Sequence, residues 1–187
     1  MTTSSTGAAQ TYLARLDQAL GRVSRDQLDA GVALVGDAWR RGAQVITLGN
    51  GGSAMTALHF INDWNKALFL AAGRAFRGRS LIDNIGLVMA YANDISFEDV
   101  FVQQLKNILA PGDLVIAISG SGNSENVIRA VDYANANEAV TLGLCGYDGG
   151  RLMSAAQYCL WANVNDMQIC EDIHAIFGHI VMQTLCV

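Results

Sequence analysis

Charged residues and proline are scarce in this sequence. Asp, Glu, Lys and Arg make up only 16% of its 187 residues, 51% of the residues are hydrophobic, and there is a single proline. The net charge of −5 argues against a nucleic-acid-binding surface, because such surfaces are basic. No uninterrupted apolar run approaches the roughly 18 residues of a membrane helix, so we expect no membrane partner. The composition predicts one domain, residues 1–187, with a sheet buried on both faces or a large subunit interface.

Signals for secretion and for a zinc finger are also missing. The first seven residues are small and polar, and they lack the basic and apolar regions of a signal peptide. The four cysteines form no C-x-x-C pair and no zinc-finger spacing. Each lies among apolar neighbours; they are Cys145, Cys159, Cys170 and Cys186. We therefore expect buried, reduced thiols in a cytoplasmic protein.

Two loops rich in serine and glycine stand out instead. Residues 49–53 (Gly-Asn-Gly-Gly-Ser) follow the apolar run 45–48, and residues 119–124 (Ser-Gly-Ser-Gly-Asn-Ser) follow the apolar run 114–118. Each pattern predicts a strand, a tight loop and the start of a helix. Glycine lets the backbone approach an anion, hydroxyls donate hydrogen bonds, and a helix N-terminus adds free N–H groups. We expect a phosphorylated small molecule at the carboxyl ends of parallel strands.

The two loops lack the spacing of three common glycine and serine motifs. Neither loop has the G-x-G-x-x-G pattern of a dinucleotide site, and the chain has no G-x-x-x-x-G-K-[ST] nucleotide loop. Neither serine loop matches the G-x-S-x-G nucleophile elbow. The loop serines are therefore predicted to bind phosphate rather than to act as nucleophiles.

Strand and helix patterns alternate along the chain. The expected helices are residues 11–23, 24–41, 54–69, 85–91, 97–109, 125–136 and 167–185. The expected strands are residues 44–48, 80–82, 114–118, 140–144 and 158–161. Residues 146–150, which include three glycines, are expected to break the chain between the last two strands. This order predicts an α/β fold, with a parallel sheet of about five strands between helical layers.

Two of the histidines have a carboxylate residue at helical spacing in the sequence. His59 and Asp63 are four residues apart and share a helix face. Glu171 and His179 are eight apart and also share a face, and His174 lies three residues after Glu171. The two pairs together have the donor set of a divalent metal such as zinc. They equally suit a general acid and a general base, or polar groups that satisfy one another between two helices.

The chain resembles the sugar isomerase (SIS) domain, and within it the phosphoheptose isomerase subfamily. The resemblance covers nearly the whole chain, including the N-terminal helices. It is carried by residues 49–53, His59 and Phe60, Asn93 and Asp94, residues 119–124, and His174 and His179 in the last helix. It implies a three-layer α/β/α sandwich with a five-stranded parallel sheet in flavodoxin-like order. It also implies a homotetramer with active sites at subunit interfaces, in which helices within residues 10–41 serve oligomerisation.

The resemblance also implies roles for individual residues. The phosphate would be bound by the second loop, including Gly120, and by four serines, Ser53, Ser119, Ser121 and Ser124. The sugar would be contacted by Asn50, Gly51, Gly52 and Asp94. One zinc per subunit would be held by His59, Asp63, Glu171 and His179, and the acid–base pair would be Asp63 and His179.

This chain departs from the family pattern at three positions. The family has glutamate where this chain has Asp63, glutamine where it has Glu171, and usually arginine where it has Ala67 beside Lys66. Two carboxylates and two neutral imidazoles would neutralise Zn²⁺. The shorter carboxylate of Asp63 would shift the geometry of proton transfer, and an error of about 1 Å can lower a rate about 10²-fold.

The resemblance implies an aldose–ketose isomerase. It would convert sedoheptulose 7-phosphate to D-glycero-D-manno-heptose 7-phosphate by moving a proton between C1 and C2 through an enediol. Two alternatives are kept open. One is a non-catalytic, sugar-phosphate-binding or protein-interaction SIS protein of the replication-initiator-associating type. The other is an isomerase of a different sugar phosphate.

Overall fold

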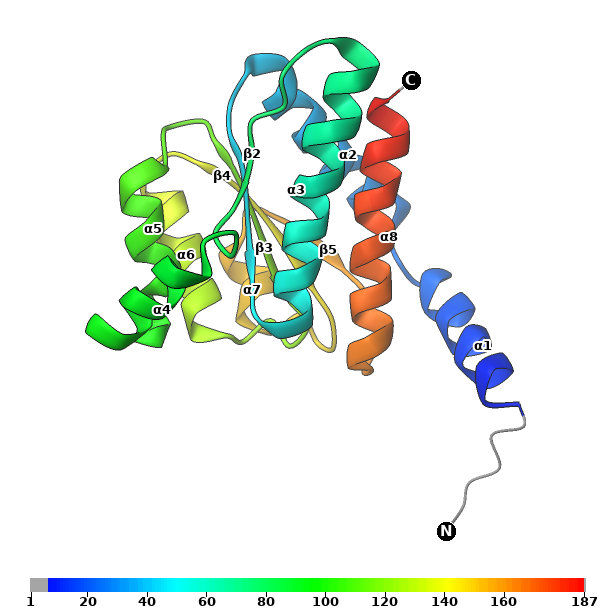
Figure 1. Ribbon diagram of the computed structural model, residues 1–187. Coiled ribbons are helices and arrows are strands. Elements are labelled where there is room, and N and C mark those ends of the chain that lie inside the picture. Colours follow the sequence, from blue (N-terminus) through cyan, green and yellow to red (C-terminus); the bar gives the residue numbers. More distant parts are fainter. Residues whose placement is uncertain (1–6, 187) are drawn as a thin grey trace.

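A computed structural model describes residues 7–186 as helices packed on both faces of one sheet (Figure 1). The helices are α1 (Ala8–Leu20), α2 (Arg25–Arg41), α3 (Gly51–Ala72), α4 (Ile85–Asp94), α5 (Val100–Ile108), α6 (Glu125–Ala136), α7 (Gly150–Ala155) and α8 (Met167–Leu185), with a 3-10 turn η1 (Phe97–Asp99) before α5. The strands are β1 (Val45–Gly49), β2 (Gly78–Ser80), β3 (Leu114–Ser119), β4 (Val140–Cys145) and β5 (Tyr158–Trp161).

The sheet has the order β2-β1-β3-β4-β5, and every neighbouring pair is parallel. This is the flavodoxin-like order, and the predicted five-stranded α/β fold is confirmed. Because all strands run the same way, the loops after β1 and β3 lie at the same edge of the sheet. The order changes direction between β1 and β3, which is where open α/β sheets bind their ligands.

Side chains of β3 alternate between two cores. Leu114, Ile116 and Ile118 point into a core with α2, α3 and α8, whereas Val115 and Ala117 point into a core with α5, α6 and α7. Every residue of β3 is buried, as expected for a strand covered on both faces. The continuous apolar runs of the sequence therefore reflect a sheet between two helical layers (Figure 1).

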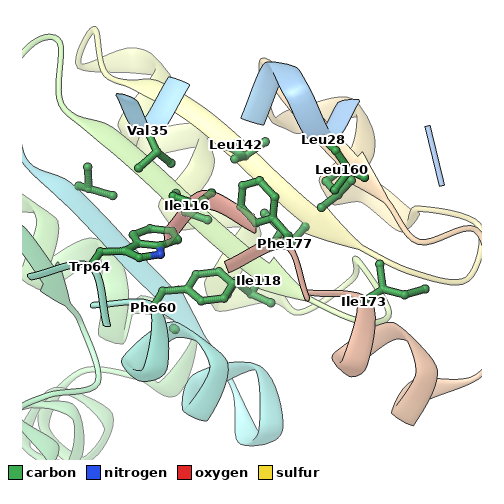
Figure 2. Close-up of a cluster of buried hydrophobic side chains, with 14 of the residues drawn as sticks. Leu28, Val35, Phe60, Trp64, Ile116, Ile118, Leu142, Leu160, Ile173 and Phe177 are labelled. Atoms are coloured by element: carbon green, nitrogen blue, oxygen red, sulfur yellow. The ribbon is translucent and has the colours of Figure 1, made fainter. Parts of the chain in front are cut away.

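The first core locks α3 against α8. Phe60 stacks on Trp64 with ring centroids 4.9 Å apart and meets Phe177 of α8 edge-on at 6.1 Å, and the three rings lie together in Figure 2. The Trp64 indole N–H donates to the carbonyl of Gly178 over 3.0 Å. A Cβ added at Gly178 would overlap the Phe60 ring. The helices approach this closely only because residue 178 has no side chain.

Three elements differ from the sequence prediction. The short helix α7 was not predicted; it begins at Gly150, the last residue of the segment expected to break the chain, and continues to Ala155. Strand β2 spans Gly78–Ser80 and so meets the expected strand 80–82 only at its last residue. The helix expected at 97–109 begins as the 3-10 turn η1 before α5.

Two helices keep most of their surface away from the cores. The structure describes all of α1, in which only Ala19 is buried, and all of α4, in which no residue is buried. Figure 1 shows α1 at the side of the molecule, beyond the layered body. Its Tyr12 hydroxyl donates to Asp172 of α8 over 2.7 Å. Across residues 7–186, no helix is both long enough and apolar enough to cross a membrane.

Candidate active site

The two serine–glycine loops form one wall each of a small pocket at the carboxyl edge of the sheet. The pocket has a volume of about 270 Å³. It is lined by Asn50, Gly51, Ser53, Ile118, Ser119, Gly120, Ser121, Ser124, Met167 and Glu171. Seven of the nine residues predicted to bind the substrate therefore line one cavity, and the other two, Gly52 and Asp94, do not.

The hydroxyls of this pocket come from the ends of two strands and the starts of two helices. Ser53 is buried in the first turn of α3, and Ser119 ends β3. The Ser119 hydroxyl donates to Ser124 Oγ over 3.4 Å, and Ser121 Oγ accepts the backbone N–H of Asn123 over 3.3 Å. Both α3 and α6 start at the pocket, so the positive ends of two helix dipoles face it. The arrangement suits a phosphate dianion.

A second group of polar side chains lies farther along α3 and α8. His59 and His179 face each other with their Nε2 atoms 3.0 Å apart. His59 Nε2 is also 3.4 Å from Asp63 Oδ2. These three residues bring one ligand atom each to within 4.8 Å of one another. We call them the triad. The His59 side chain is 45% exposed and that of Asp63 is 24% exposed, so a substrate can reach them.

The close contact between α3 and α8 creates the triad. His59 directly precedes Phe60, and His179 directly follows Gly178. Since Phe60 occupies the space that a side chain at position 178 would fill, the two histidines are carried to hydrogen-bonding distance. Asp63 follows His59 by one turn of α3 and so joins the same face.

Glu171, the fourth predicted metal ligand, lies apart from the triad. Its carboxylate packs against Gly52, where an added Cβ would come within 2.6 Å of Glu171 Cδ. The side chain also lines the pocket of the serine loops. Glu171 and His179 share a face of α8, but eight residues correspond to about 12 Å of helix. In this structure Glu171 therefore lines the pocket of the serine loops.

Two further residues singled out in the sequence lie outside both groups. Asp94 is exposed at the end of α4, where its carboxylate accepts a hydrogen bond of 2.8 Å from Asn93. His174 is fully buried, and its Nε2 is 3.3 Å from the carbonyl oxygen of Cys145. Burial lowers the pKa of His174 from 6.5 to about 4, because the charged imidazole would lose its hydration. His174 is thus a neutral core residue.

Two residues near the pocket carried no prediction. Met167 forms part of the pocket wall. Asn126, the second residue of α6, is 2% exposed and shares two hydrogen bonds with Asn50. The signal for Asn126 is a polar residue two positions after the second serine loop, directly before the apolar residues Val127 and Ile128.

Comparisons with a family profile and with individual known proteins point to the same family. The profile of the SIS domain matches residues 11–146. The chain belongs to the SIS domain family. The phosphoheptose isomerase of Geobacter sp. (strain M21) is 35% identical over 154 residues, which are 82% of this chain and 80% of that protein. The phosphoheptose isomerase of Syntrophotalea carbinolica is 32% identical over 183 residues, 96% and 93% of the two chains. Within the SIS family, this chain groups with the phosphoheptose isomerases.

Solved structures agree on the fold. The phosphoheptose isomerase of Neisseria gonorrhoeae superposes with a TM-score of 0.87, covering 96% of each chain at 23% sequence identity. The SIS chain therefore has the same layered architecture over nearly its full length, including the N-terminal helices.

Proposed function

We propose that this SIS protein is an aldose–ketose isomerase that converts sedoheptulose 7-phosphate to D-glycero-D-manno-heptose 7-phosphate. One observation carries the proposal: the phosphate pocket and the triad lie along the same helix pair, at a separation that suits this substrate. Ser53, which lines the pocket, and His59 are six residues apart on α3, or about 9 Å along the helix. An extended seven-carbon chain with its phosphate ester has a similar length of about 10 Å. A phosphate among the serines would therefore bring C1 and C2 to the triad.

In this proposal the serine loops anchor the substrate, and the triad moves protons. Asp63 removes the proton from the carbon next to the carbonyl, and it later returns the proton to the neighbouring carbon. His179 exchanges the proton of the substrate oxygen, for which a histidine suits neutral pH. The names of the curated relatives favour this enzyme over the non-catalytic binding protein.

The triad also fits a zinc ion. Two ligands about 2.05 Å from a tetrahedral Zn²⁺ are about 3.3 Å apart. The separations of 3.0 Å (His59 to His179) and 3.4 Å (His59 to Asp63) lie close to that value. Zn²⁺ held there would polarise the carbonyl oxygen of the substrate as a Lewis acid. We propose Glu171 as the fourth ligand, which it becomes only if its side chain turns away from Gly52.

We further propose that the whole chain is one SIS domain that assembles as a homotetramer in the cytoplasm. Apolar side chains of α4 are exposed, among them Ile85 at 61% and Met89 at 66%, and α1 covers little of its own subunit. Exposed apolar patches of this kind mark protein interfaces. Contact through α1, α2 and α4 would also carry Asp94 toward a neighbouring subunit's sugar. The four free thiols suit a reducing compartment.

The deciding experiment is incubation of the purified protein with sedoheptulose 7-phosphate, with and without added zinc, followed by detection of the aldose. We expect turnover that Asp63→Asn and His179→Ala each lower by at least about 10²-fold. Gln183→Ala, on the same helix but one turn beyond His179, is the matched control and should keep wild-type turnover. Tight binding of the sugar phosphate without turnover, at any zinc concentration, would instead support the non-catalytic alternative.

A further inference from the structure

We propose that Asn126 is a positioning residue of the phosphate pocket, which holds the side chain of Asn50 away from the N-terminus of α3. The two amides bond reciprocally. Asn50 Nδ2 donates to Asn126 Oδ1 over 2.8 Å, and Asn126 Nδ2 donates to Asn50 Oδ1 over 3.0 Å. The pair ties the first serine–glycine loop to the helix that follows the second. The inference rests on the proposed function, because it assumes that this pocket binds phosphate.

The position of Asn50 shows what Asn126 prevents. Asn50 is the N-cap of α3, with the extended backbone usual for that position. Asparagine is among the best N-cap residues, because its side-chain oxygen accepts an N–H from the first turn of the helix. Here the Asn50 side chain makes no such bond, since Asn126 engages its Oδ1 instead. The first-turn N–H groups of α3 are thereby left for an anion in the pocket.

The second loop repeats the arrangement. Ser124 is the N-cap of α6, and its side chain makes no capping bond but accepts from Ser119. Three other helices have ordinary side-chain caps, from Ser24 (α2), Asn84 (α4) and Asp166 (α8). Asp99, the N-cap of α5, makes no capping bond either; it continues from the 3-10 turn η1 and bonds Ser96 and Arg129. Diverted caps therefore occur at the two helices that follow the serine–glycine loops, whereas α8, whose Met167 also lines the pocket, keeps its side-chain cap from Asp166.

Burial makes the Asn126–Asn50 contact specific. Asn126 is 2% exposed among the buried residues Val127 and Ile128. A buried amide without partners is costly, so each amide fixes the orientation of the other. Removal of Asn126 frees Asn50 to cap α3, where it would compete with the phosphate for the same N–H groups. A capping bond corresponds to about tenfold in an equilibrium constant, so phosphate affinity should fall about tenfold.

The test is calorimetric titration of the full-length protein with inorganic phosphate and with sedoheptulose 7-phosphate. Asn126→Ala removes the amide, and Asn126→Leu removes it while keeping its volume, in case the alanine variant folds poorly. Asn135→Ala is the matched control: Asn135 lies on the same helix and bonds Ala155, Thr141 and Gln157 at the far end of the sheet. We expect both Asn126 variants to bind about tenfold more weakly, with a raised KM and little change in kcat. Asn135→Ala should lower Tm but leave the affinity unchanged.

A double-mutant cycle separates positioning from a general loss of structure. If Asn126 acts through Asn50, Asn50→Ala/Asn126→Ala should bind phosphate as well as Asn50→Ala alone. An undiminished effect of Asn126→Ala in that background would overturn the inference, as would wild-type affinity in both Asn126 variants. Failure of the wild-type protein to bind either ligand would overturn the proposed function instead.

Discussion

Substitution of Gly178 by alanine should damage the active site without touching any polar residue in it. The added Cβ would overlap Cε1 and Cδ1 of Phe60 and lie 3.1 Å from its Cζ. The ring has little room to turn, because it is fully buried between Trp64 and Phe177. The two helices must therefore separate. His59 and His179, which flank this contact, should move apart with them.

The size of the effect follows from two magnitudes. Overpacking a core by one methyl group lowers the free energy of unfolding by typically about 1–3 kcal/mol. For a domain of this length, that is a fall in Tm of about 2–4 °C per kcal/mol. A displacement of about 1 Å between reacting groups lowers turnover about 10²-fold. We therefore expect Gly178→Ala to remain folded, with Tm reduced by several degrees and kcat reduced about 10²-fold.

The assay is isomerisation at a temperature where the variant is fully folded by circular dichroism. Gly36→Ala is the matched control, because its Cβ would meet Leu185 of α8 at 3.2 Å, far from the triad. It should keep full activity. Phe60→Leu in the Gly178→Ala background should recover part of the lost turnover by making room for the methyl group. Wild-type turnover in folded Gly178→Ala would refute the idea that this helix contact sets the triad.

Three further outcomes test other parts of the site. Ser121→Ala should weaken sugar-phosphate binding by roughly 1–3 kcal/mol, the value of a hydrogen bond to a charged group, and unchanged affinity by calorimetry would remove Ser121 from the phosphate site. Glu171→Gln should raise the affinity for inorganic phosphate about threefold at low salt, because the substitution removes a negative charge from the pocket wall. The same variant should bind zinc more weakly in a chelator competition. A lower phosphate affinity would contradict the electrostatic effect. The pKa of His174 is lower in the folded protein (about 4) than its ordinary value of 6.5. As the pH falls, the unfolded state therefore binds the proton before the folded state does. The free energy of unfolding should fall by about 3 kcal/mol between pH 6.5 and pH 4. Urea denaturation of His174→Phe should lack this part of the pH dependence, and an identical pH dependence in both proteins would show that His174 does not cause it.

The elements that sequence predicts well here have local causes. The central strands β1 and β3 are continuous apolar runs ended by glycine-rich loops, and the order of elements leaves only a parallel sheet. Ser24 is recognisable as an N-cap because Gln27 follows three residues later, and Ser24 Oγ accepts the Gln27 N–H over 3.3 Å. In each case the residues that decide the structure are close together in the chain.

The elements that differ depend on distant contacts. Strand β2 ends before the apolar residues Leu81 and Ile82, and it is held in place partly by Asn65, whose side chain bonds both backbone groups of Gly78. The short helix α7 has no apolar periodicity of its own, but its Leu152 N–H donates to the carbonyl of Gly122 in the phosphate loop. No pattern within either segment carries this information.

In the candidate site, too, some features follow from the local sequence and others depend on distant contacts. Membership of the phosphate pocket follows from topology, because both loops end neighbouring strands and must meet. Spacing along a helix shows only that two residues share a face. Glu171 and His179 do share one face of α8, but that face meets Gly52 at one end and His59 at the other. The partner of each residue is decided by how α3 packs on α8, which depends on Gly178 and Phe60.

In the proposed function, the same helix pair holds both ends of the substrate on one rigid scaffold. The phosphate pocket lies at the start of α3 and the triad lies two turns farther on, and the buried Trp64 and Phe60 prevent one helix from sliding along the other. The distance between anchor and triad is therefore a property of the core rather than of mobile loops. A substrate with a much shorter carbon chain can satisfy the serines or reach the triad, but not both at once. In the proposed function, selection for chain length thus comes from helix packing, and the departures at Asp63 and Glu171 adjust the chemistry at the two ends of a fixed frame.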